Sequence, residues 1–182
     1  MEKKFIEFLT SLAEKEDRAA LAHLRRGLGK KPGTAVEMFP IIAPRLYRGL
    51  SRKAEDACYL VAALFAFHPV HNNSLKSLGE TMRMVADLLK EKKDDSIPQS
   101  IERRFGALLD SDAEQLPSRL RQVISMARAK GAPVNYETLL RDIVRWDNPE
   151  KHVQRRWASD FWSAGPESAD VSSDNISESR EE

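Results

Sequence analysis

Arginine is the residue whose spacing in this chain points most clearly to chemistry. Basic residues come in pairs or near-pairs at five places, namely Arg25/Arg26, Arg52/Lys53, Arg103/Arg104, Arg119/Arg121 and Arg155/Arg156. A guanidinium grips phosphate through two parallel hydrogen bonds and stacks on bases, so this pattern favours a polyanionic partner. The same pattern is also typical of the solvated face of an amphipathic helix with local ion pairs, such as Asp142 with Arg145. Both interpretations stay open at this level.

Side chains that could carry catalysis are few. His68 and His71 in FHPVHNN have i, i+3 spacing, but Pro69 interrupts a helix and no nearby carboxylate completes a metal set, so we expect a surface loop. A helical metal-dependent nuclease built on these histidines is the remaining enzymatic alternative. Asp94 and Asp95 fall in a polar linker, whereas acid–base carboxylate pairs need an enclosed pocket.

Two further features are expected to be structural. GKKPGT at residues 29–34 does not have the spacing of a phosphate-binding loop and is expected to form a turn. Cys58, the single cysteine, lies in an apolar run and is expected to be a buried thiol, and one cysteine excludes an internal disulfide or a cysteine-based zinc site. We therefore predict a protein that is not an enzyme, with no metal, no cofactor and no small-molecule substrate.

The charge of the chain is unevenly distributed. Of its 29 basic and 28 acidic residues, one base and six acids fall within 163–182, which leaves 28 bases against 22 acids before them. This last segment has almost no apolar residues, so we expect a disordered acidic tail. The remaining body, with a charge of +6, is consistent with a polyanionic partner.

The elements that must position the arginines are predicted to be helices. Apolar residues recur at helical spacing in segments that begin near residues 5, 19, 52, 75, 101, 116, 139 and 151, and Ser51 can cap the third of them. In 151–162, Val153, Trp157 and Phe161 form an apolar seam opposite Arg155 and Arg156. No segment alternates apolar and polar residues in the manner of a strand. The prediction is an all-α fold.

The stretch EKKDDSIPQS interrupts the apolar pattern and is a candidate boundary. We predict two small antiparallel helical bundles, an N-terminal part at 1–92 and a C-terminal bundle at 93–164, followed by the tail at 165–182. No apolar run is long enough to span a membrane, and the charged N-terminus lacks a signal core, so we expect a cytoplasmic protein with no membrane contact.

Several motifs together resemble one family. IERRFGALLDSDAEQLPSRLRQVISMARAKG, YETLLRDIVRWDNPEKHVQRRWASDFW, HLRRGLGKKPG and EDACYLVAALFAFHP occur in the order found in the CasB family, the small subunit of type I-E CRISPR Cascade complexes. The resemblance covers about residues 5–164. It implies an all-α, non-catalytic subunit that lies, in two copies, against the backbone subunits that hold the CRISPR RNA. It also implies a basic surface that guides displaced single-stranded DNA and stabilises the R-loop.

The resemblance identifies part of the candidate nucleic-acid site. Its motifs carry over Arg26 in LRRG, Arg52 before the apolar helix, Arg104 in ERRF, Arg121 in RLRQ and, as a weaker match, Lys151 in PEKH. Charge alone adds Arg119, Arg141, Arg145, Arg155 and Arg156. On their helix, Arg119 and Arg121 fall on opposite borders of the apolar stripe, where they can frame a groove. The alternative is a purely structural scaffold whose arginines meet acidic patches on neighbouring subunits and contact no strand.

Overall fold

The computed structural model describes residues 1–90 and 96–163, and within these ranges the chain is helical. The helices are α1 (Glu2–Glu14), α2 (Arg18–Arg25), α3 (Phe39–Ile42), α4 (Arg52–Phe67), α5 (Leu78–Asp87), α6 (Gln99–Leu109), α7 (Leu116–Lys130), α8 (Tyr136–Val144) and α9 (His152–Trp162), with 3-10 turns η1 (Val36–Met38) and η2 (Ala43–Arg45). Extended pairing in the described residues is limited to one isolated bridge between His71 and Val134. The predicted all-α fold is confirmed.

Local side-chain chemistry sets where several helices begin. The Ser51 hydroxyl accepts from the Ala54 amide at the start of α4, as predicted. Asp17 caps α2 and Asn135 caps α8 in the same way, since each supplies an acceptor for an amide that has no partner within its helix. The helix expected to begin near residue 75 begins instead at α5, where Ser77 is the N-cap.

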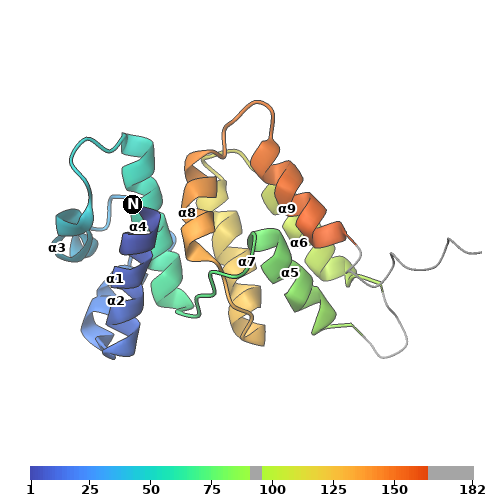
Figure 1. Cartoon of the computed structure of the whole chain (residues 1–182), viewed down its shortest axis with the longest axis horizontal. Coiled ribbons are helices and arrows are strands. Elements are labelled where there is room, and N and C mark those ends of the chain that lie inside the picture. The colour runs from blue at the N-terminus through green and yellow to red at the C-terminus, as the bar shows by residue number, and fades with distance from the viewer. Residues whose placement is uncertain (91–95, 164–182) are drawn as a thin grey trace, which may run out of the picture.

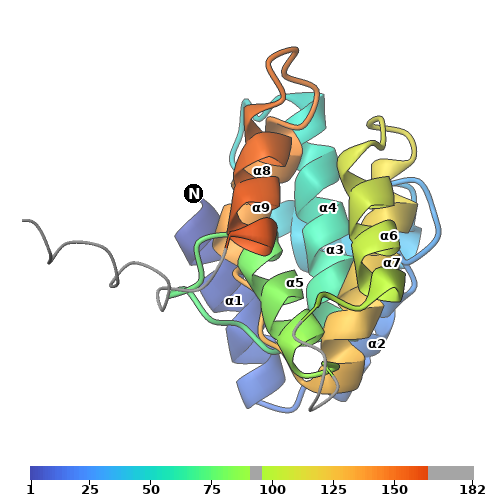
Figure 2. The ribbon, with the colours of Figure 1, turned by 90° about the vertical axis from the view of Figure 1, so that its right-hand side faces the viewer.

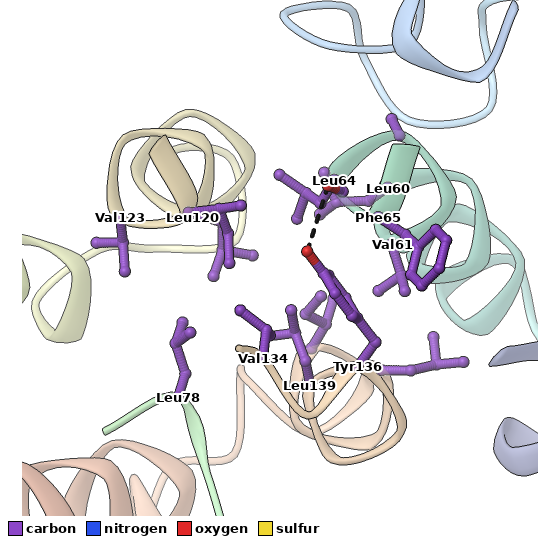
Figure 3. Packing of buried hydrophobic residues seen from close by; sticks show 14 of the residues in the cluster. Leu60, Val61, Leu64, Phe65, Leu78, Leu120, Val123, Val134, Tyr136 and Leu139 are labelled. Atoms are coloured by element: carbon purple, nitrogen blue, oxygen red, sulfur yellow. Dashed lines mark hydrogen bonds between the residues drawn. The ribbon is translucent and has the colours of Figure 1, made fainter. Parts of the chain in front are cut away.

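Helix α4 is the centre of the core. Its residues from Ala57 to Ala66 are all buried, because other helices cover it on several sides. Figure 1 places α1, α2 and α4 at one end of the long axis, α5, α6 and α9 at the other, and α7 and α8 between them. In Figure 3, side chains of α4, α7 and α8 point toward one another. A single hydrophobic cluster therefore joins both ends of the described chain.

Tyr136 ties α8 to the end of α4 inside this cluster. Its ring is fully buried and lies against Phe65, with 5.2 Å between the ring centroids. The Tyr136 hydroxyl donates to the His68 carbonyl at 2.7 Å. It also lies 3.4 Å from the Leu64 carbonyl, the contact drawn as a dashed line in Figure 3. Burial raises the pKa of this phenol, which keeps it a hydrogen-bond donor.

The packing of α5 bears on the predicted division of the chain. Although α5 precedes residue 92, it packs against α9, α7 and α6, and Figure 2 shows it among the C-terminal helices. The contact with α9 is close: a Cβ on Gly79 would overlap the Trp157 carbonyl. The boundary between 92 and 93 stays a prediction, and the position of α5 favours a boundary before Leu78. Residues 91–95 of the stretch EKKDDSIPQS and the whole predicted tail at 165–182 lie outside the described residues.

The core residues expected near the C-terminus are buried as predicted. Val153, Trp157 and Phe161 of α9 and Trp146 after α8 are each at most 1% exposed. The two tryptophan rings lie with their centroids 5.2 Å apart. In the ranges that the structure describes, no helix combines the length and apolar character needed to cross a membrane.

Candidate nucleic-acid interface

Two adjoining cavities form a groove bordered by α7. The first, of about 640 Å³, is lined by the loop between α2 and η1 and by parts of α4, α7 and the end of α8. The second, of about 680 Å³, is lined mainly by α7, with Arg104 of α6, Phe67 of α4 and Gly29 of the loop; α6 and α7 lie side by side in Figure 2. Gly29, Ser118 and Arg121 line both cavities. We call the two cavities the basic groove; its basic lining residues are Lys30, Lys31, Lys53, Arg104 and Arg121.

Arg121 reaches from α7 to the loop after α2. Its Nη1 atom would lie 3.1 Å from a Cβ placed on Gly29. Gly29 also has φ +79°, in the left-handed region that side chains other than hydrogen rarely adopt. The glycine therefore serves both the turn of the loop and the close approach of the guanidinium.

Arg104 faces the second cavity from α6. Its Nη1 lies 3.5 Å from the Met126 sulfur on α7, so the side chain lies along the surface of the neighbouring helix. Neither Arg104 nor Arg121 pairs with a carboxylate in the described parts of the chain. Their charges are consequently open to an external anion.

Arg26 and Lys30 lie at the edge of the groove beside Glu37. The Glu37 carboxylate is 3.6 Å from Arg26 Nη1 and 3.7 Å from Lys30 Nζ. Backbone hydrogen bonding, followed by the charges of Lys30 and Arg26, holds the pKa of Glu37 below its ordinary value in spite of partial desolvation. Glu37 is therefore ionised at neutral pH and offsets part of the positive charge at this edge.

Arg52 lies at the other end of the same loop. It is the first residue of α4, its Nε is 3.2 Å from Asp56 Oδ1, and its Nη2 lies close to Gly33. The structure thus brings four of the motif arginines around residues 27–33. Arg26 precedes this loop, Arg52 lies beside Gly33, Arg121 approaches Gly29 and Arg104 lines the adjoining cavity.

Three lysines of the groove were missed by the sequence prediction. Lys30 and Lys31 belong to the GKKPGT segment, which forms the expected turn but also lines the first cavity. Lys53 lines it from α4 and pairs with Asp147 at 2.6 Å. The available signals were the Lys30-Lys31 pair and the Arg52/Lys53 pair, because the partner surface on α7 comes from far along the chain.

Arg156 has a different environment from the groove residues. Its Nη2 lies 2.5 Å from Asp142 Oδ1, and Trp157 Nε1 donates to Asp142 Oδ2 at 2.7 Å. The Asp142 side chain is 3% exposed, so its charge must be compensated from within the protein. The local ion pair of Asp142 with Arg145, given above as an example of the structural interpretation, is not found among the described residues, because the fold places Arg156 of α9 against this carboxylate instead.

Arg104 and Arg121 are the candidates that line the groove. Arg26 and Arg52 lie beside its loop without lining either cavity, and the remaining five candidates do not line it either. They are Arg119, Arg141, Arg145, Lys151 and Arg155. Arg141 lies within hydrogen-bond distance of Thr138 Oγ1, and its charge also reaches Glu2 in α1. Arg119 and Arg121 were both expected to frame a groove on α7. Arg121 lines both cavities of the basic groove, and Arg119 lines neither. A nucleic-acid role for these five stays a prediction.

His68 and His71 lie in the loop between α4 and α5, as predicted, but His68 is buried and His71 half-buried instead of lying at the surface. His68 is 3% exposed, with its Nε2 2.7 Å from the Ala132 carbonyl, and His71 Nδ1 is 3.1 Å from the Val134 carbonyl. These contacts join the end of α4 to the segment before α8, a pairing that local sequence does not encode. Among the described residues no group of three or more His, Cys, Asp or Glu side chains is placed to hold a metal ion.

Cys58 is a buried structural thiol, as expected. It is 1% exposed, and burial raises its pKa to about 12. The thiol is therefore protonated at neutral pH and cannot serve as a nucleophile.

Comparisons with known proteins identify the family. The family model of the CRISPR-associated protein Cse2 matches residues 20–162. A Cse2 protein of Thermus thermophilus is 37% identical over 165 residues, which cover 90% of this chain and 90% of that protein. The chain belongs to the CRISPR-associated protein Cse2 family.

Solved structures share the fold. A crystal structure of CasB from Thermus thermophilus is 32% identical, with a TM-score of 0.75 and coverage of 90% of this chain and 98% of that one. A chain of a pre-nicking CRISPR RNA-guided surveillance complex is 23% identical, with a TM-score of 0.72 and coverage of 88% and 90%. The resemblance to the CasB family is thereby confirmed.

Proposed function

We propose that this Cse2 family protein is a non-catalytic subunit of a type I-E CRISPR RNA-guided surveillance complex. In such a complex it holds the displaced single strand of DNA along the basic groove and so stabilises the R-loop. Its partners are the other subunits, a second copy of itself and the guide RNA assembly. Base pairing with the guide reads the sequence, and the protein needs only to bind backbone.

One observation carries this proposal. The four arginines of the family motifs lie far apart in sequence but gather around residues 27–33, where Arg104 and Arg121 remain without carboxylate partners among the described residues. Packing of the hydrophobic core does not require these cations to lie close together. Because Lys30 and Lys53 of the groove pair with Glu37 and Asp147, and Arg52 beside it pairs with Asp56, we expect weak binding by the free protein. Tethering within a complex raises the effective concentration enough to make such binding useful.

The scaffold interpretation is the second candidate. In that case the groove receives acidic side chains of neighbouring subunits and contacts no strand. A nuclease that uses His68 and His71 is disfavoured, because each ring lies against a backbone carbonyl inside the fold. We expect no cleavage of DNA or RNA, with or without divalent metal.

Assembly of the complex with altered subunits separates the two candidates. We expect the variant Arg52→Ala/Arg104→Ala/Arg121→Ala to co-purify with the other subunits and the guide, but to lose protection of the displaced strand in footprinting. The matched control is Lys4→Ala/Lys15→Ala/Arg18→Ala, which removes three exposed cations that line neither cavity; Arg18 is 88% exposed and pairs with Glu16. Failure of the triple variant to incorporate would favour the scaffold. Normal incorporation with normal strand protection would contradict the assignment of the groove.

A further inference from the structure

The first cavity of the basic groove has an apolar floor that a purely phosphate-binding surface does not need. Ala57 and Leu60 of α4, Leu116 of α7, and Ile143 and Trp146 at the end of α8 line it. The Trp146 indole is held in place because its Nε1 donates to the Ser111 carbonyl at 2.9 Å. The volume of about 640 Å³ lies within the usual range of roughly 300–1,000 Å³ for sites that enclose small ligands.

The charges around this cavity are not those of a phosphate pocket. Four cations line it, Lys30, Lys31, Lys53 and Arg121, but so do the carboxylates of Asp56, Glu114 and Asp147. A phosphate placed inside would meet these carboxylates, whereas the amino groups of a base could donate to them. In addition, Asp56 Oδ1 is buried and accepts no hydrogen bond, although Arg52 Nε lies 3.2 Å from it as an ion-pair partner.

From these features we infer that the cavity takes one unstacked nucleobase from the strand that lies along the groove. The inference rests on the proposed function and adds to it that the chain holds the strand by a base as well as by phosphates. Arg121, which lines both cavities, contacts the backbone where the base turns inward. The cavity is lined by apolar side chains and mixed charges, so it accepts bases without reading a particular sequence, as sequence-tolerant single-strand sites do.

The test compares two oligomers that have the same number of phosphates. One is a single strand of mixed bases and the other is a fully abasic strand of equal length, each titrated against the full chain at low salt by fluorescence anisotropy. We expect the abasic strand to bind about tenfold more weakly, within the range that stacking of a single base contributes. Both strands should give the same dependence of affinity on salt, since the phosphate contacts are unchanged. Equal affinity for the two strands would overturn the inference.

A filled cavity supplies the second arm. Ser118 is exposed and lines the first cavity near its border with the second, so Ser118→Trp should block it and reduce the preference for bases over the abasic strand to nearly none. Ser125→Trp, which lines only the second cavity, is the matched control and should keep the preference. A strand carrying 2-aminopurine should change its emission on binding to the Ser125→Trp variant and not to the Ser118→Trp variant.

The outcomes separate this inference from the proposed function. A loss of base preference with an unchanged dependence of affinity on salt tests only the role of the first cavity. Replacing Arg104 and Arg121 tests the proposed function, because it changes the dependence of affinity on salt. If Ser118→Trp keeps the base preference but prevents incorporation into the complex, a side chain of a partner subunit occupies the cavity, and the nucleobase assignment is wrong.

Discussion

The basic groove and the junction of α8 with α9 are both rich in arginine, yet they use it differently. In the groove, Arg104 and Arg121 have no carboxylate partner among the described residues and face two adjoining cavities. At the junction, Arg156 compensates the buried carboxylate of Asp142. An arginine pair in a sequence therefore says little about function by itself. What separates the two regions is whether the fold places a buried acid opposite the guanidinium.

The largest expected effect breaks the junction. Arg156→Ala removes the ion-pair partner of the buried Asp142 carboxylate and leaves it the hydrogen bond from Trp157 Nε1. Because the Arg156 side chain is itself 43% exposed, we expect the free energy of unfolding to fall by about 2 kcal/mol, less than for a fully buried pair. The neighbouring exposed Arg155→Ala is the control and should cost less than about 0.5 kcal/mol. Urea unfolding of both variants measures the difference. Equal stability of the two variants would show that Asp142 does not depend on Arg156.

The second prediction concerns the groove, where we expect a change in DNA binding and little change in stability. Arg52→Ala/Arg104→Ala/Arg121→Ala should change stability little, because these side chains lie at the surface, but it should flatten the dependence of log K on log salt for single-stranded DNA. We expect a change of about two units in slope, roughly 0.7 for each lost phosphate contact.

The matched control for this slope is Lys4→Ala/Lys15→Ala/Arg18→Ala, which removes the same number of exposed cations from α1, its C-cap and the start of α2, where none of them lines the groove. Its slope should stay close to that of the unaltered protein, because only phosphate contacts, and not net charge, set the slope. An equal flattening in the control would extend the binding surface to α1 and α2. It would also remove the distinction between the groove and the rest of the basic surface.

A third, smaller effect sharpens the comparison within the groove. Gly29 and Gly49 both have left-handed backbones, with φ +79° and +89°, but only Gly29 has Arg121 beside it. Gly29→Ala and Gly49→Ala should each destabilise the fold by about 1 kcal/mol through backbone strain. Only Gly29→Ala should also weaken binding of single-stranded DNA. The slope of log K on log salt should flatten by less than the roughly 0.7 that one lost phosphate contact gives. Equal weakening by both would show that the position of Arg121 is unimportant.

Local sequence predicted most of the fold. Periodicity and capping residues such as Ser51 act within one or two turns, so the helices and the burial of Trp157 and Phe161 could be read directly. The packing of α5 with α9 could not, because it depends on the close approach of Gly79 to the Trp157 carbonyl, between residues far apart in sequence. The burial of His68 was missed for the same reason, since its partner is the Ala132 carbonyl.

The candidate site was predicted only in part. The family motifs selected four arginines that the fold does bring together, whereas charge alone also selected Arg156, whose partner Asp142 lies on another helix. The groove lysines Lys30 and Lys31 were taken only as part of a turn, because nothing in the local sequence shows that α7 faces them. Residue type identifies which side chains can bind phosphate; only tertiary contacts show which of them are free to do so.

The smallest expected effect concerns residues 165–182, outside the described part of the chain. Their sequence has six acids, one base and very few apolar residues, so it cannot bury enough apolar surface to offset the entropy of ordering. Deletion should therefore leave the melting temperature unchanged, while removal of five net negative charges should modestly strengthen binding of single-stranded DNA at low salt. Thermal unfolding and anisotropy of the truncated chain check both. A clear loss of stability would show that the segment docks on the body, and weaker binding would show that it belongs to the nucleic-acid interface.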